Sequence, residues 1–132
     1  MTPVTWQRLE GVAIAVVAIM AAVMLDGWWW PLALFLLFDL SALGYVSNPR
    51  LGAALYNAGH SLIGPSLMGM WALAGWGFGV PGGRVAALIT ASWVFHVGVD
   101  RALGYGLKVS DDFKHTHLGW IGGAGPARST EN

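Results

Sequence analysis

The stretch "ASWVFHVGVDRALGYGLK", residues 91–108, decides how the chain is interpreted. It begins as an apolar helix of the kind found in membranes and then places His96 and Asp100 one helical turn apart. Side chains four residues apart lie on the same face of a helix. An imidazole and a carboxylate on one face of an apolar helix need polar side chains as interaction partners. The rest of the sequence indicates which residues supply them.

The composition is typical of a membrane protein. Of the 132 residues, 55% are hydrophobic and 11% are charged, whereas soluble domains carry about 25% charged residues. The formal net charge is zero, so no nucleic-acid partner is expected. The chain has no cysteine, which excludes disulfides, thiolate metal sites and cysteine nucleophiles.

The hydrophobic pattern predicts an all-α integral membrane protein, a four-helix up-down bundle. A spanning helix needs about 20 mostly apolar residues, and such segments lie at about residues 6–24, 28–46, 51–78 and 85–103. Short connections rich in turn residues make consecutive helices antiparallel neighbours. Pro65 predicts a kink in the third helix. We expect residues 1–121 to form one transmembrane domain with a short cytoplasmic C-terminal segment, and residues 122–132 to be a disordered tail.

The positive charges predict the orientation. One side of this topology carries Arg8, Arg50, Arg101, Lys108, Lys114 and Arg128, and the other side carries only Arg84. Because cytoplasmic segments are enriched in lysine and arginine, both termini are expected on the cytoplasmic side of a bacterial inner membrane. Membrane lipids are then the expected partners. The sequence leaves open protein partners and a homo-oligomer.

Each predicted helix contributes polar side chains to its cytoplasmic half. In chain order they are Glu10, Asp39, Ser41, Asn57, His60, Ser61, Ser92, His96 and Asp100. A rise of about 1.5 Å per residue brings most of them to a similar depth. Ionisable side chains inside a membrane usually face the interior of the bundle and mark a functional site. The pattern therefore predicts one polar chamber with walls from all four helices.

The side chains predicted to line this chamber include the imidazole and carboxylate groups that commonly bind metal ions. Imidazole and carboxylate groups suit zinc, iron or manganese. The candidate ligands are His60, His96 and Asp100, with Asp39 next. Glu10 and Asp39 are the candidate catalytic bases that would accept a proton from water. The predicted activity is metal-dependent hydrolysis of a lipid-like substrate.

Four further residues are candidates for supporting roles around the ligands: Asn57, Ser92, Arg101 and His117. Such groups orient metal ligands through hydrogen bonds, and His117 could also cover the mouth of the chamber. Three other interpretations stay open, and with them whether the protein is an enzyme. The polar cluster could only join helices in a non-enzymatic membrane subunit, His60 and His96 could bind haem or another pigment, or the chamber could relay protons.

Five motifs together resemble a family of small bacterial membrane proteins. They are "RLEG" (8–11), "DLSALGY" (39–45), "YNAGH" (56–60), "HVGVDRALGYGLK" (96–108) and "FKHTHLG" (113–119). The family is classified as domain of unknown function 4260, and the resemblance covers about residues 8–121. It implies a four-helix membrane protein without an assigned activity. It also implies that the family's motifs include Glu10, Asp39, Asn57, His60, His96, Asp100, Arg101 and His117.

Overall fold

The computed structural model describes residues 1–123 and residue 125, so residues 124 and 126–132 of the predicted tail lie outside the described residues. The protein is all-α apart from a small antiparallel hairpin of β1 (His115–Thr116) and β2 (Gly119–Trp120). The three longest helices are α1 (Pro3–Met24), α5 (Ile63–Phe78) and α6 (Gly83–Leu103). Between α1 and α5 lie α2 (Trp30–Ala33), α3 (Phe35–Asp39), the 3-10 helix η1 (Leu40–Val46) and α4 (Pro49–His60).

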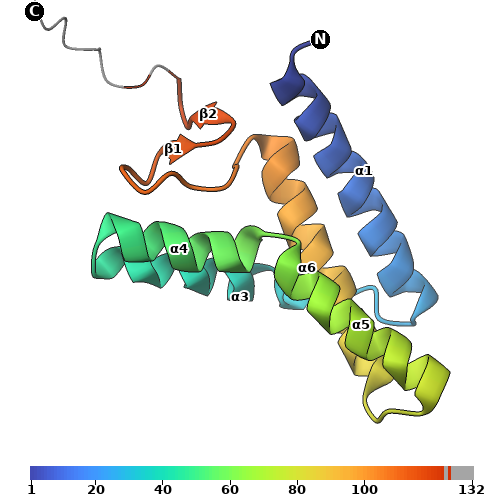
Figure 1. Ribbon diagram of the computed structural model, residues 1–132. Coiled ribbons are helices and arrows are strands. Elements are labelled where there is room, and N and C mark those ends of the chain that lie inside the picture. The colour runs from blue at the N-terminus through green and yellow to red at the C-terminus, as the bar shows by residue number, and fades with distance from the viewer. Residues whose placement is uncertain (124, 126–132) are drawn as a thin grey trace, which may run out of the picture.

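The first and last helices of the chain pack against each other in opposite directions (Figure 1). A Cβ atom on Gly11 would lie 2.6 Å from the backbone nitrogen of Ala102, and one on Gly98 would lie 2.7 Å from that of Ala15. Only glycine allows the two backbones to come this close, and small residues serve the same purpose where helices meet in membranes. The contact holds α6, which carries His96, against α1.

Each of these two helices has an arginine near its N-terminal end that donates a hydrogen bond to a backbone carbonyl at the C-terminal end of the other helix. The Nε atom of Arg8 donates a hydrogen bond to the carbonyl of Ala102 at 2.9 Å. The Nη2 atom of Arg84 donates to the carbonyl of Leu25 at 2.7 Å. The last carbonyls of a helix have no partner within it, so the two arginines fix the register of the α1–α6 pair at both ends.

The second and third predicted spans are broken rather than continuous. Residues 28–46 form α2, α3 and η1, and residues 51–78 are divided between α4 and α5. Pro65 explains the second break because proline lacks an N–H and clashes with the carbonyl four residues earlier. That residue is Ser61, whose backbone is extended, with φ −91° and ψ 161°. The predicted all-α class is thus confirmed, whereas the four-helix membrane bundle stays a prediction.

On the N-terminal side of this break, α4 packs against η1 and does not continue in line with α5 (Figure 1). Gly59 allows this approach, because a Cβ atom there would lie 2.7 Å from the hydroxyl of Ser41. The hairpin of η1 and α4 points its end residue, His60, toward α6. The break at Ser61 and this close contact thus place a histidine of the third predicted span at the middle of the fold.

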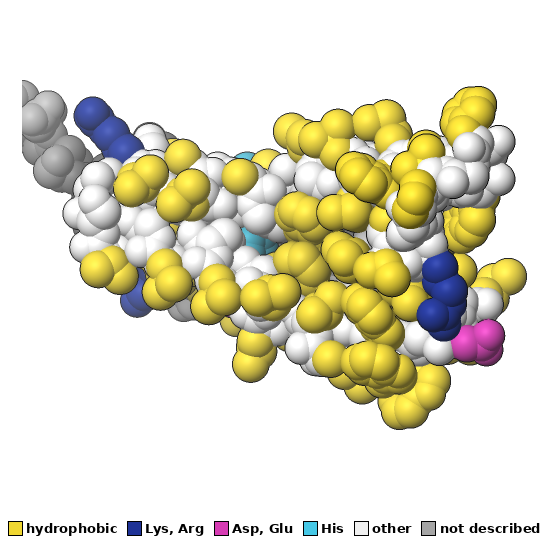
Figure 2. Space-filling model, turned by 90° about the horizontal axis from the view of Figure 1, so that it is seen from below, with side chains coloured by type: hydrophobic (Ala, Val, Ile, Leu, Met, Phe, Trp, Pro, Cys, Tyr) yellow, Lys and Arg dark blue, Asp and Glu magenta, His cyan; other side chains and the backbone are white. Residues whose placement is uncertain are grey.

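Among the described helices, α1 is the one long and apolar enough to cross a membrane by length and composition. Hydrophobic side chains cover much of the face shown in Figure 2. Large apolar residues on α1, α3 and α5, including Val17, Leu36 and Leu73, are exposed. The protein therefore carries extensive apolar surface outside its small core of alanines on α5 and α6.

Candidate metal centre

Four side chains from three separate parts of the chain converge at the middle of the fold. Asp39 ends α3, His60 ends α4, and His96 and Asp100 lie one turn apart on α6. Each contributes one possible ligand atom, and the four atoms lie within 4.8 Å of one another. We call these residues the His–Asp cluster. The structure thus brings together the three predicted ligands and Asp39.

The spacing of these atoms could accommodate a metal ion. The two Nε2 atoms of His60 and His96 lie 3.0 Å apart. From His60 Nε2, Asp39 Oδ1 and Asp100 Oδ2 both lie at 3.4 Å, and the same oxygens lie 3.6 and 3.8 Å from His96 Nε2. Tetrahedral coordination with bonds of about 2.0–2.1 Å places neighbouring ligand atoms roughly 3.3 Å apart. The observed distances bracket that value.

The backbone of α4 determines which nitrogen of His60 faces the cluster. Its Nδ1 atom lies 3.0 Å from the carbonyl of Tyr56 and 3.3 Å from the hydroxyl of Ser41. A carbonyl can only accept, so Nδ1 carries the proton in the neutral ring. The lone pair is then on Nε2 and points into the cluster. Hydrogen bonds of this kind orient metal-bound histidines.

Packing holds the other histidine in place. His96 is fully buried, with 0% of its side chain exposed. Its ring contacts those of Phe35 and Phe38, with centroid distances of 4.7 and 5.5 Å. The Nδ1 atom of His96 has no hydrogen-bond partner among the described residues. Contacts with these two aromatic rings therefore help to set the direction of its Nε2 atom.

Tyr56 links two members of the cluster and was not among the predicted residues. Its hydroxyl donates to Asp100 Oδ2 at 3.1 Å. Its ring stacks on His60, with centroids 3.7 Å apart and planes inclined by 9°. One signal for it was present in the sequence, because Tyr56 precedes His60 by four residues and so shares its helix face.

Three predicted residues lie away from the ligand atoms. Glu10 is exposed on α1 and is not part of the His–Asp cluster. The hydroxyl of Ser92 is buried and donates to the carbonyl of Leu88 at 2.7 Å, one turn back in its own helix. Arg101 is half-buried near the end of α6. Their supporting or catalytic roles stay predictions.

Asn57 and His117 organise the segment that follows α6. The amide of Asn57 accepts from the backbone nitrogen of Lys108 at 2.6 Å and donates to its carbonyl at 2.9 Å. The Nδ1 atom of His117 accepts from the backbone nitrogen of Leu107 at 2.8 Å. Desolvation lowers the pKa of His117 below its ordinary value of 6.5, which favours the neutral ring that can accept. Both side chains fold the C-terminal segment over the bundle.

The chain matches the family model described as a domain of unknown function, DUF4260, over residues 4–121. The chain belongs to this family. No curated protein and no solved structure matches it. Membership assigns no reaction, so the chemistry of this DUF4260 member rests on the site itself.

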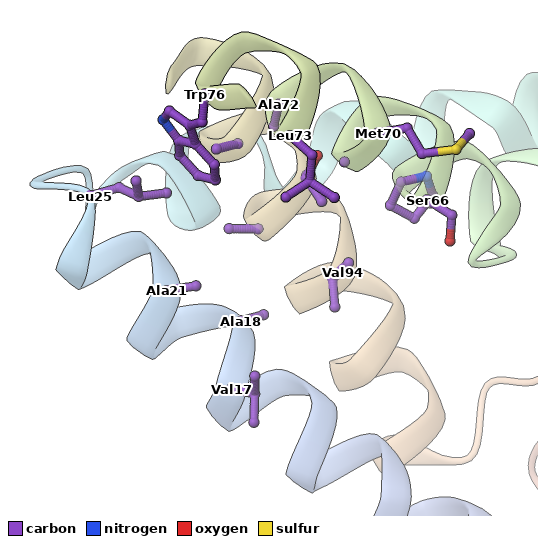
Figure 3. Close-up of a pocket in the computed structure, with 15 residues that line it drawn as sticks. Val17, Ala18, Ala21, Leu25, Ser66, Met70, Ala72, Leu73, Trp76 and Val94 are labelled. Atoms are coloured by element: carbon purple, nitrogen blue, oxygen red, sulfur yellow. The ribbon is translucent and has the colours of Figure 1, made fainter. Parts of the chain in front are cut away.

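Two hollows of similar size differ in chemistry. A groove of about 510 Å³ lies between α1, α5 and α6, where Val17, Ala18 and Ala21 of α1 face Leu73 and Trp76 of α5 (Figure 3). None of its lining residues in the described part of the chain has a titratable side chain. A cleft of about 490 Å³ includes Asp39 and Asp100 in its wall. We call this second hollow the cluster cleft, and it gives access to the His–Asp cluster.

Proposed function

We propose that the His–Asp cluster holds one divalent metal ion (zinc, iron or manganese) and that this site hydrolyses a lipid-like substrate. The observation that carries the proposal is the convergence of two imidazole nitrogens and two carboxylate oxygens within 4.8 Å. His60, His96 and Asp100 are largely shielded from water, and such side chains are costly to bury unless they pair or coordinate a metal. A bound metal would polarise a carbonyl or phosphoryl oxygen and activate water for attack.

The surroundings of each group support a division of roles. His60, His96 and Asp100 are the ligands, because their side chains are 3%, 0% and 14% exposed and are held by neighbouring groups. The side chain of Asp39 is 45% exposed and lines the cluster cleft. It is placed to take a proton from water that enters the cleft. Three protein ligands and an open position are typical of catalytic zinc sites.

A haem group suits this arrangement less well. A haem iron held by His60 and His96 would need a flat slot between the two rings for the macrocycle. Their Nε2 atoms lie 3.0 Å apart. Asp39 and Asp100 occupy the space beside them. The geometry favours a bare ion.

The proposal places the protein in a membrane, with both termini on the cytoplasmic side and lipids as its surroundings. At about 1.5 Å per residue, α1 and α6 are each long enough for a hydrocarbon core of roughly 30 Å. Figure 1 shows the N-terminus and the β-hairpin at one end of the α1–α6 pair and the α5–α6 turn at the other. The exposed apolar side chains of α1 and α5 would then contact lipid.

The test is the metal content of the full chain purified in detergent, measured by mass spectrometry. We expect about one metal ion per chain in the wild type and its loss in the variant His60→Ala/His96→Ala. His115→Ala is the matched control because it removes a partly exposed histidine outside the cluster, and it should keep the metal. Circular dichroism checks that each variant remains helical. Equal metal content in all three proteins, or none after reconstitution with zinc, iron and manganese, would contradict the proposal.

A second arm separates metal binding from hydrolysis. Asp39→Asn should retain the metal but lose hydrolysis of a panel of chromogenic acyl and phosphate esters presented in micelles. Substituting Asp26→Asn should leave this activity unchanged, because Asp26 is an exposed aspartate outside the cluster. If no ester is hydrolysed by a metal-loaded wild type, the cluster is a metal site without the proposed reaction.

A further inference from the structure

The cluster cleft is lined by both polar and apolar side chains. Asp39 and Asp100 of the His–Asp cluster lie in its lining, and Phe35, Leu103 and Ile121 supply much of its apolar surface. One positively charged side chain, that of Lys108, lines it among the described residues. Pockets that bind small molecules commonly combine an apolar lining with a few placed polar groups.

Lys108 is a buried cation with unused donors. Only 6% of the residue is exposed. Its Nζ atom donates to the carbonyl of Phe113 at 2.7 Å and lies 4.0 Å from the centre of that ring and 4.8 Å from that of Tyr56. The ammonium has three donors, and in the described part of the chain neither of the other two has a hydrogen-bond or carboxylate partner.

The backbone around Lys108 is fixed independently of its side chain. Asn57 of α4 binds both the nitrogen and the carbonyl of Lys108. Lys108 also forms an isolated β-bridge with Thr116 of the hairpin. The ammonium is therefore held one aromatic ring away from the metal ligands, because it lies over Tyr56, which stacks on His60. Burial lowers the pKa of Lys108 below its ordinary value of 10.5, which reflects the cost of an incompletely solvated charge.

The charges that line the cleft favour an anion when a metal is present. Asp39 and Asp100 together carry two negative charges, which a divalent ion balances. Lys108 is then the one charge in the described lining of the cleft that the metal site does not balance, although Asp112 acts on it from outside the lining. In a largely apolar space, electrostatic attraction is stronger than in water. We propose that the cluster cleft binds an amphiphile with an anionic head group, whose charged oxygen contacts Lys108 and whose apolar chain lies along Phe35, Leu103 and Ile121. This inference rests on the proposed metal site and names the class of its substrate.

The test compares binding of three probes to the full chain in dodecyl maltoside micelles, by calorimetry, after metal content has been measured. Dodecyl phosphate supplies an anionic head and a chain, dodecanol supplies the chain alone, and inorganic phosphate supplies the anion alone. We expect dodecyl phosphate to bind at least about tenfold more tightly than either of the others, as a charge-assisted hydrogen bond allows. In Lys108→Met this preference should disappear, whereas Lys108→Arg should keep it.

Lys114→Met is the matched control because Lys114 is an exposed lysine of the same segment, and its preference should equal that of the wild type. Lys108→Gln serves as a second uncharged variant if Lys108→Met does not fold. Equal binding of dodecyl phosphate by the wild type and the uncharged variants, at unchanged metal content, would overturn the inference and leave the metal site intact. Inorganic phosphate binding as tightly as dodecyl phosphate would overturn the assignment to an amphiphile. Preference that depends on Lys108 in a protein that takes up no metal would contradict the proposed function and the charge balance argued above, and would support only the contact between Lys108 and the head group.

Discussion

The chain contains two His–Asp pairs with the same spacing, and they have different surroundings. His96 and Asp100 lie four residues apart on α6, and Asp111 and His115 lie four residues apart before and in the hairpin. The second pair is the tighter, at 2.8 Å against 3.8 Å. Its side chains are 30% and 56% exposed, whereas those of the first pair are 0% and 14% exposed. Close pairing therefore does not distinguish a candidate site from a surface contact.

Convergence with other parts of the chain distinguishes the two pairs. His96 and Asp100 meet Asp39 and His60, which come from two other elements. His115 instead stacks on Trp120, with ring centroids 4.5 Å apart. Among the described residues, the group that could hold a metal excludes this second pair. The two pairs therefore differ in burial and in whether side chains from other elements join them.

The largest expected effect comes from neutralising one aspartate of each pair. Asp100→Asn removes an anionic ligand and should lower metal affinity by more than the roughly 100-fold that changes around a ligand can cause. Asp111→Asn should leave the affinity unchanged. Competition with a fluorescent zinc chelator measures both constants. Similar losses in the two variants would remove the distinction between the pairs.

A smaller effect is expected from the aromatic neighbours of the two pairs. Tyr56→Phe removes the hydroxyl that donates to Asp100 but keeps the ring on His60. Metal affinity should fall by about tenfold, at the lower end of the range for groups that orient ligands. Trp120→Leu removes the stacking partner of His115. This change should leave the metal affinity unaltered. The same chelator assay applies, and an unchanged Tyr56→Phe variant would show that Asp100 needs no orienting contact.

The smallest effect concerns the pH dependence of the exposed pair. The hydrogen bond from His115 holds the pKa of Asp111 below its ordinary value of 3.8. A depressed folded pKa means that the pair stabilises the fold above the unfolded value and that this contribution is lost as the pH falls through the folded pKa, below about pH 4. Because both groups are exposed, the effect on stability is small.

Titration of the Asp111 carboxyl carbon by NMR measures this directly. In His115→Ala the pKa of Asp111 should rise toward 3.8, while the backbone nitrogen of Asp112, at 2.7 Å, retains part of the depression. The metal content should stay as in the wild type. A pKa that does not move would show that His115 does not bind the carboxylate in solution.

Much of the candidate site could be predicted from side-chain type and spacing. His96 and Asp100 share a helix face, and His60 and Asp39 lie at a matching depth, so all four were expected together. Depth alone cannot give the direction of a side chain around its helix. Gly11 faces α6, and its neighbour Glu10 points about 100° away because a helix has 3.6 residues per turn. Glu10 therefore matches the others in depth while lying on an exposed face.

The breaks in the second and third spans were harder to predict. The apolar pattern continues across residues 61–65 and indicates one long helix, although Pro65 predicted a kink. How far α4 turns depends on its contact with η1 through Gly59 and Ser41, which the sequence does not reveal. Tyr56 escaped a search for ionisable side chains because its ring and hydroxyl gain their roles only after His60 and Asp100 are in place.

The glycine contact between α1 and α6 has a consequence for the order of events during synthesis. Gly11 and Gly98 meet, yet one emerges from the ribosome long before the other. At about 5–20 residues per second, the interval is roughly 4 to 17 seconds. During that time the α1 surface around Gly11 cannot pack against α6, because α6 and its residue His96 have not yet been synthesised. The hairpin of η1 and α4 can form from neighbouring residues in the meantime, so His60 waits for α6. The His–Asp cluster is therefore completed only after α6 has been made and has packed against the earlier helices.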